Sequence, residues 1–187
     1  MRRNIPQIFA ILLLTILVLC SGCVFPGSEK PVVNGGLSQI TTPEISPYIS
    51  FEEAKQKFED YNGAEKLPVY YIFSRDVDGS GNAESWLFGV RQSTGTELLM
   101  YDRTGWKTIP WNASLPSEEI MLNQGVSPGT LFSQNKQVIL STSSPSIPER
   151  RDLVLKQGMY TLTINSGSAS RTLMFNATTG VLITSNV

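Results

Sequence analysis

Histidine is absent from this chain of 187 residues. Its absence excludes Ser-His-Asp and Cys-His catalysis, His-ligated zinc and iron sites, and pH switches based on imidazole. Most secreted hydrolases depend on one of these devices. The chemistry that remains is that of carboxylates, that of a serine–lysine pair, or none.

Cysteine and net charge are also scarce. The two cysteines, Cys20 and Cys23, lie near the N-terminus, so the rest of the chain has neither a disulfide nor a thiolate metal site. Of the 15 basic residues, removing Arg2 and Arg3 leaves 13 against 16 acidic ones, a formal charge of −3. With its basic residues scattered, the chain carries no patch for nucleic acid or for anionic lipid.

The first 23 residues have the layout of an export signal. Arg2 and Arg3 precede an apolar run over residues 8–19, which is too short for a membrane helix of about 20 residues. Small residues then lead to Cys23, so we predict a lipoprotein-type signal peptide over 1–23 with lipid attached to Cys23. The position three before it is Cys20, where such signals usually carry leucine. The alternative is an ordinary or uncleaved signal that happens to end in cysteine.

Residues 24–49 are rich in Pro, Gly, Ser and Thr, a composition that predicts a flexible tether. We expect one folded domain over 50–187, with possible halves at 50–111 and 127–187. This organisation places the domain outside the cytoplasm, anchored to the cell membrane through its N-terminus.

The expected fold class is α+β, with small antiparallel sheets or meanders packed by one or two amphipathic helices. Ser50 and Glu53 form a capping box, and apolar residues recur at helical spacing up to Tyr61, which predicts a helix over 51–61. Strands are predicted over 69–74, 85–91 and 97–101. A short helix is expected over 118–123, and Ser127-Pro128 opens another that reaches about Ile139.

The C-terminal segment has the clearest strand pattern, because Tyr160, Leu162 and Ile164 alternate with threonines. A hairpin over 171–175 and 181–185 follows, with Val181 and Ile183 expected on the buried face. The stretch 85–101 resembles 169–184, each with two strands joined through Thr-Gly. This likeness indicates either a diverged helix–meander duplication or chance similarity between two hairpins.

Two pieces of the chain, Ser-Phe-Glu-Glu-Ala-Lys at 50–55 and Phe-Asn-Ala-Thr-Thr-Gly-Val-Leu at 175–182, resemble the PepSY-like group of exported lipoproteins and peptidase propeptides. The resemblance covers about half of the mature chain. It implies a helix packed on a small antiparallel sheet and a role in binding extracytoplasmic partners, peptidases among them. It implies no catalytic residue and no cofactor.

The segment 76–84 partly matches a calcium-binding loop. Asp76, Asp78, Ser80 and Glu84 supply side-chain oxygens at loop positions 1, 3, 5 and 9, and Gly81 stands at position 6. Position 12 is Leu87, where a bidentate glutamate is needed. The sequence offers no metal-ligand candidates other than these four residues. The favoured alternative is a plain polar loop between two strands.

Other chemical motifs have simpler interpretations. Ser133 and Lys136 match the Ser-x-x-Lys pair of penicillin-recognising enzymes, but no companion motif follows, so we expect a solvated helix face. The acidic pairs at 52–53 and 118–119 are interpreted as helix N-terminal charges. Aromatic residues cluster at 70–111, where they form a core or, at Trp106 and Trp111, an exposed binding surface.

Asn112 and Asn176 begin glycosylation sequons in expected loops. Taken together, these features favour a membrane-anchored binding module without catalytic activity, whose partner is an extracytoplasmic protein or a surface polymer. The alternatives are a secreted enzyme that uses carboxylate or Ser-Lys chemistry and a calcium-stabilised cell-surface structural protein.

Overall fold

The computed structural model describes residues 46–63, 66–93, 95–141 and 148–186. They form three helices and eight strands. The helices are α2 (Phe51–Asn62), α3 (Pro128–Gln134) and α4 (Lys136–Leu140). The strands are β1 (Val69–Ser74), β2 (Ser85–Gln92), β3 (Gly95–Asp102), β4 (Gly105–Pro110), β5 (Glu149–Lys156), β6 (Met159–Ser166), β7 (Ala169–Asn176) and β8 (Leu182–Asn186).

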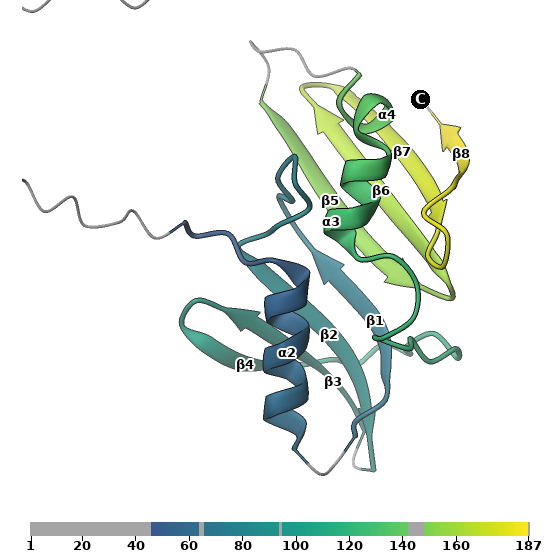
Figure 1. The fold of residues 1–187 in the computed structure, drawn as a ribbon. Helices are drawn as coiled ribbons and strands as arrows, with labels where there is room; N and C mark the ends of the chain where they lie inside the picture. Colours follow the sequence, from purple (N-terminus) through teal and green to yellow (C-terminus); the bar gives the residue numbers. More distant parts are fainter. Residues whose placement is uncertain (1–45, 64–65, 94, 142–147, 187) are drawn as a thin grey trace, which may run out of the picture. The chain divides into compact units, whose positions relative to one another are not determined.

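All eight strands belong to one antiparallel sheet in the order β4-β3-β2-β1-β5-β6-β7-β8 (Figure 1). The expected mixture of helices and antiparallel strands is confirmed, but one large sheet replaces the small separate sheets. The reason is the pairing of β1 with β5, where Ile72 lies opposite Leu155 and Phe73 opposite Val154. This pairing joins two four-stranded meanders edge to edge.

Helix α2 begins as its sequence predicts. The Ser50 hydroxyl accepts a hydrogen bond from the Glu53 amide at 3.1 Å, which caps the first turn. Phe51, Ala54 and Phe58 are buried, and the ring of Phe58 stacks on Phe88 of β2 with centroids 4.7 Å apart. The last residue of the expected apolar face, Tyr61, is instead 52% exposed, because it lies at the helix end and only touches the rim of Trp106.

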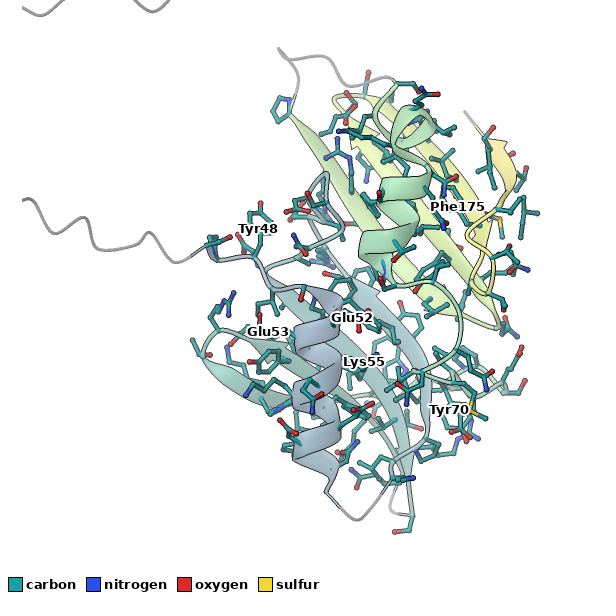
Figure 2. All side chains as sticks on the ribbon, viewed as in Figure 1. Tyr48, Glu52, Glu53, Lys55, Tyr70 and Phe175 are labelled. Atoms are coloured by element: carbon teal, nitrogen blue, oxygen red, sulfur yellow. The ribbon has the colours of Figure 1, made fainter. Side chains whose placement is uncertain are left out.

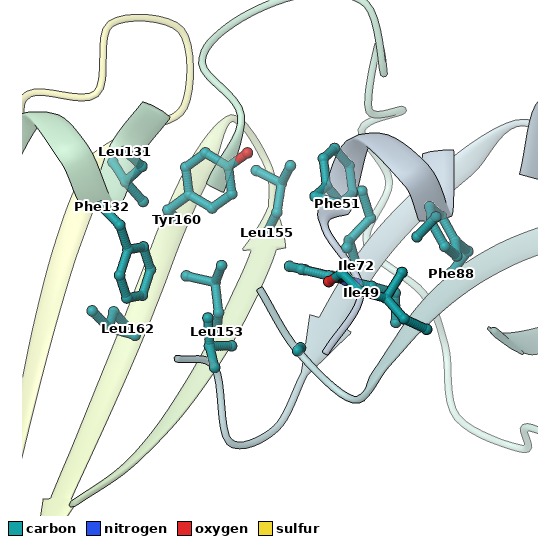
Figure 3. Close-up of a cluster of buried hydrophobic side chains, with 14 of the residues drawn as sticks. Ile49, Phe51, Ile72, Phe88, Leu131, Phe132, Leu153, Leu155, Tyr160 and Leu162 are labelled. Carbon is teal, nitrogen blue, oxygen red and sulfur yellow. Dashed lines mark hydrogen bonds between the residues drawn. The ribbon is translucent and has the colours of Figure 1, made fainter. Parts of the chain in front are cut away.

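The second helical segment is capped by Ser127, and Pro128 occupies its first turn. It is broken at Asn135, whose side-chain amide donates hydrogen bonds to the carbonyls of Leu131 and Gly180. These bonds tie the break to the β7–β8 turn. Leu131, Phe132 and Ile139 are buried, and Figure 3 shows Phe132 directed toward Leu162.

The strands of the two meanders, β1–β4 and β5–β8, pair in corresponding registers. Trp86 of β2 lies opposite Tyr101 of β3, and Tyr160 of β6 lies opposite Phe175 of β7, so each residue follows its counterpart by 74 positions. The same offset relates every pair of β2–β3 to a pair of β6–β7. The hairpin that corresponds to 85–101 is therefore 159–175, and the stretch 169–184 corresponds to β3–β4 instead.

Three other expectations are corrected. Residues 118–123 form bends and a turn, not a helix, because the Ile120 amide bonds to the Val69 carbonyl of β1 at 2.6 Å. Strand β5 was not expected, since its charged start masks the alternation of Leu153 and Leu155. Val181 and Ile183 are 61% and 54% exposed, because a register shift places Leu182 opposite Phe175.

Candidate functional site: the open face of the sheet

The described helices pack on only one of the two faces of the sheet. Phe88, Ile72, Leu155 and Tyr160 follow one another across four strands on one face, and α2, α3 and α4 pack on that face (Figures 1 and 3). On the opposite face, which we call the open face, no helix of the described residues packs. The side chains there alternate with those of the buried core.

One row of side chains crosses the open face from edge to edge. Register places one residue of every strand in it: Lys107, Met100, Leu87, Phe73, Val154, Thr161, Met174 and Thr184. All but Lys107 are partly buried, and Lys107 is exposed. Four adjacent members, Met100, Leu87, Phe73 and Val154, are apolar, and we call these four the apolar row.

A loop covers the part of the open face beside the apolar row. Leu115, which is 8% exposed, lies against Gly89 of β2, where an added Cβ would meet the Leu115 Cδ2 atom at 2.9 Å. The same Cβ would meet the Tyr71 Cβ at 2.9 Å and Leu98 at 3.3 Å. A groove of about 300 Å³ runs along this loop, lined by Tyr71, Trp111, Ser114, Leu115, Pro116 and Lys156. Glycine at position 89 is what lets the loop approach the sheet so closely.

The carboxylates that the strands place on the open face are already paired. Asp102 binds the Lys107 ammonium at 2.6 Å, and Asp152 binds the Arg150 guanidinium at 2.9 Å. Hydrogen bonds from Lys107 and then Thr104 lower the pKa of Asp102 to about 2. Asp102 is therefore ionised at neutral pH, and both carboxylates are engaged with cations of the same face.

Three cations of this face have no carboxylate partner among the described residues: Arg91, Lys156 and Arg75, whose guanidinium lies over the Phe73 ring at 5.8 Å. Arg91 lies over the ring of Tyr70 at 4.3 Å and donates to the Pro116 carbonyl at 3.4 Å. Lys156 lines the groove beside Tyr71. Burial raises the pKa of the Tyr71 phenol, so its hydroxyl stays neutral at the groove.

The two halves of the sheet, β1–β4 and β5–β8, can be compared position by position because their strands pair in the same register. On the helix-covered face, corresponding positions are apolar in both halves, as in Phe88 and Leu162 or Leu99 and Leu173. On the open face, Phe73 and Met100 correspond to Val154 and Met174, which are also apolar, but four other apolar residues of the first half correspond to polar residues of the second. The pairs are Tyr71 with Asp152, Leu87 with Thr161, Leu98 with Thr172, and Ile109 with Asn186. The fold itself therefore does not require apolar side chains at these open-face positions.

The candidate calcium loop at 76–84 contains hydrogen bonds between its own residues. The Asp78 Oδ1 atom accepts from the amides of Ser80 at 2.8 Å and Asn82 at 2.9 Å. Asp76 is exposed and lies 3.5 Å from the Arg150 guanidinium, and Ser80 and Glu84 are also exposed. Nowhere in the described ranges do three His, Cys, Asp or Glu side chains gather as a metal would need. The Asp78 carboxylate is thus engaged within the loop, whereas Asp76, Ser80 and Glu84 are exposed.

This loop also connects parts of the fold that are distant in sequence. Ala83 pairs with Ile49, the Val77 amide donates to the Arg151 carbonyl of β5 at 2.8 Å, and Gly81 lies against Pro128 of α3. A Cβ at Gly81 would come within 2.7 Å of the Pro128 carbonyl oxygen. The position of the loop between the two halves is a structural role that the sequence pattern did not indicate.

The remaining candidates do not converge on one site. Ser133 and Lys136 are exposed and belong to different helices. In the first turn of α2, Glu52 pairs with Lys55 at 2.9 Å and Glu53 with Arg103 at 2.8 Å (Figure 2). The helix-start interpretation is right for this pair and wrong for residues 118–119, which precede no helix.

The three tryptophans divide between core and surface. Trp86 is fully buried, and its indole donates to the Ile49 carbonyl at 3.1 Å. Trp106 packs among the rings of Phe58, Phe88 and Tyr101 on the covered face, and Trp111 is 38% exposed at the groove. Of the two tryptophans considered for an exposed surface, Trp111 is the one that lies there.

Both glycosylation candidates are accessible. Asn112 is exposed in the loop after β4, and Asn176 is exposed at the end of β7. The Asn176 Oδ1 atom accepts hydrogen bonds from the amides of Thr178 and Thr179, and so holds the β7–β8 turn. Cys23 and residues 24–45 of the expected tether (24–49) lie outside the described residues, and the last tether residue, Ile49, is buried and pairs with Ala83. Within the described part of the chain, no helix has the length and apolar content to cross a membrane.

The open face has an apolar row, a groove and three cations without a carboxylate partner among the described residues, and the fold alone does not explain this combination. Comparison with known proteins adds no name to it: no family model, no curated protein and no solved structure matches the chain significantly.

Proposed function

We propose that this protein is a lipid-anchored, extracytoplasmic binding module that recognises a partner protein through the open face of its sheet and catalyses no reaction. The observation that carries the proposal is the contrast between the two halves. The open face of the first half has Leu87 and Ile109 where the second half has Thr161 and Asn186, and Leu87 belongs to an apolar row that continues through Met100, Phe73 and Val154.

Single exposed apolar side chains are common on protein surfaces, whereas a contiguous exposed apolar patch marks a site of interaction. The contrast between the halves matters because it concerns such a patch. Leu115 covers Tyr71 and Leu98, so those two are explained within the chain. Leu87, Phe73 and Met100 are partly exposed. The position in the second half that corresponds to Leu87 is occupied by Thr161, so the sheet does not require an apolar residue there. Burial of such side chains against a partner stabilises a complex by about 1.5–3 kcal/mol each.

Charge indicates the kind of partner. Arg91 and Lys156 border the apolar area, and the acids of this face are occupied by Lys107 and Arg150. A surface that is apolar at its centre and cationic at its rim fits a protein with an apolar patch flanked by carboxylates. The partner we propose is therefore an acidic extracytoplasmic protein.

We also infer that the two halves are diverged copies of one helix–meander unit. The shared register supports this origin, as does the likeness of Leu99-Met100-Tyr101-Asp102 to Leu173-Met174-Phe175-Asn176. A helix on a four-stranded meander is also the unit that the PepSY-like resemblance implies. In this reading one copy kept a polar open face and the other acquired a binding surface.

The enzymatic alternative has less support. A Ser-Lys pair needs burial to lower the lysine pKa, and Ser133 and Lys136 are both exposed. The acidic pair of α2 is engaged in ion pairs with Lys55 and Arg103. The binding proposal uses residues whose character is otherwise unexplained, which the enzymatic alternative does not.

The test exchanges residues between the halves. Leu87→Thr installs the residue of the second half, and Thr161→Leu is the matched reverse change. A partner captured from native membranes by the full-length protein, then purified, should bind Leu87→Thr at least about tenfold more weakly and bind Thr161→Leu like wild type. Equal affinity of wild type and Leu87→Thr would contradict the proposal, as would equal losses in both variants.

A further inference from the structure

The sheet ends on two edge strands, β4 and β8, which differ in their protection. A strand at the edge of a sheet offers unpaired backbone groups to any extended chain, and natural proteins block such edges with lysine and proline. Strand β4 has both, in Lys107 and Pro110. Strand β8 reads Leu-Ile-Thr-Ser-Asn and has neither.

The shared register of the halves makes this comparison direct. Lys107 lies opposite Met100 of β3, and Thr184 lies opposite Met174 of β7, so threonine replaces lysine at the corresponding edge position. Val181 and Ile183 are 61% and 54% exposed beside this edge. The β8 edge thus has neither lysine nor proline, and among the described residues nothing covers its two large apolar side chains; its one irregularity is the register shift at Ile183 in the pairing with β7.

We propose that β8 pairs in antiparallel fashion with β8 of a second copy of this chain, so that two sheets join across a twofold axis. Twofold pairing places each β8 side chain opposite another β8 side chain. Because the strand carries no charge, this pairing brings no like charges together. Thr184, Ser185 and Asn186 supply hydrogen-bonding groups along the seam, and Ile183 gains apolar contacts.

A second copy fits this edge better than a charged partner, since β8 has no charge with which to select one. Of the two edges, only β8 lacks lysine and proline, so the pairing closes at a dimer and does not continue into a fibre. The twofold axis that relates two antiparallel edge strands is perpendicular to the joined sheet, so both open faces lie on the same side of the dimer. The dimer would therefore present two copies of the proposed binding surface together.

Cysteine trapping tests the pairing on the full-length, lipid-anchored protein in its membrane. Ile183→Cys, Thr184→Cys and Ser185→Cys are introduced singly, with Thr108→Cys on the exposed edge of β4 as the matched control and wild type as the background for Cys20 and Cys23. We expect at least one β8 variant to form a disulfide-linked dimer about tenfold faster than Thr108→Cys. Equal rates at both edges, or links from β8 only to other proteins, would overturn the proposal.

Sedimentation of the detergent-solubilised full-length protein provides an independent readout. Wild type should sediment as a dimer, Thr184→Lys should shift it to monomer, and Thr108→Lys should leave the dimer intact. Circular dichroism checks that each variant is folded, and the cysteine variants cover the case in which Thr184→Lys is not. A monomeric wild type across the micromolar range, with no β8 cross-link, would refute self-pairing.

Discussion

At the scale of single residues, the clearest anchor of the fold is Phe58. Its ring is 2% exposed, stacks on Phe88 and touches Trp106. Few side chains of the covered face join a helix to two strands in this way. Its role therefore rests on packing alone.

We expect Phe58→Ala to lower the free energy of unfolding by about 3–5 kcal/mol, because it leaves a cavity between α2 and the sheet. Thr161→Ala, on the open face, should cost much less. Chemical denaturation of both variants measures the difference. A loss below about 1 kcal/mol for Phe58→Ala would mean that α2 contributes little to stability.

Gly89 is the residue on which the covering loop depends. Alanine would place a Cβ 2.9 Å from both the Leu115 side chain and the Tyr71 Cβ, which is too close for either to remain in place. We expect Gly89→Ala to destabilise the protein by about 1–3 kcal/mol through overpacking and to increase protease cleavage near Trp111.

Gly79→Ala is the control for this change, since a Cβ there meets nothing within 4 Å and the backbone is not left-handed. It should be close to neutral in the same denaturation experiment. If both glycine variants behaved alike, close packing of Leu115 on Gly89 would be the wrong explanation.

At the scale of elements, corresponding hairpins use the same turn device. Asp102 accepts hydrogen bonds from the Thr104 amide and hydroxyl, and Asn176 accepts from the amides of Thr178 and Thr179. Aspartate adds a charge that asparagine lacks, and this charge binds Lys107. The turn therefore needs an acceptor, whereas only the ion pair needs the carboxylate.

Asp102→Asn should consequently remove a pH dependence without removing the turn. The folded-state pKa of Asp102 is lowered to about 2 from an ordinary value of 3.8, so its stabilisation is present above about pH 4 and is lost as the pH falls toward 2. At pH 7 the variant should lose no more than about 1 kcal/mol, because the pair with Lys107 is exposed. Denaturation at pH 7, 4 and 2 should show wild type and variant converging at low pH; Asp102→Ala should be less stable throughout.

The β1–β2 loop is the other element with a testable interpretation. Were Asp76 and Asp78 calcium ligands, millimolar calcium would raise the melting temperature by binding the folded state. We expect no shift, because Asp78 already accepts hydrogen bonds from the Ser80 and Asn82 amides. Calorimetry with and without calcium decides the matter, and a rise that disappears in Asp78→Ala would establish a site.

Elements with a strong local pattern could be predicted from the sequence, and those defined by distant contacts could not. The capping box of α2 and the alternation in β6 depend on neighbours in the chain. Strand β5 begins Glu-Arg-Arg-Asp, and it is a strand because β1 and β6 flank it. The open face escaped prediction for the same reason, since its row draws one residue from each of eight strands.

At the scale of the whole molecule, we propose that the N-terminal 23 residues determine where the open face operates. Cys23→Ala should move the protein from the membrane fraction to the soluble or precursor pool, because one acyl anchor is lost. Fractionation and gel mobility unchanged from wild type would exclude lipid attachment at Cys23. Partial release of wild type would not distinguish the cases, since a single chain binds membranes only marginally.

The strand order also has a consequence for the rate and sequence of folding. Every neighbouring pair of strands except β1–β5 is consecutive in the chain, so most of the sheet can assemble by closing short loops. The β1–β5 seam instead joins residues such as Ile72 and Leu155, whose closure costs more chain entropy. Each meander should therefore form early and the seam last, which makes seam formation the slow step and leaves the central edges of both meanders transiently open to pairing with the wrong chain.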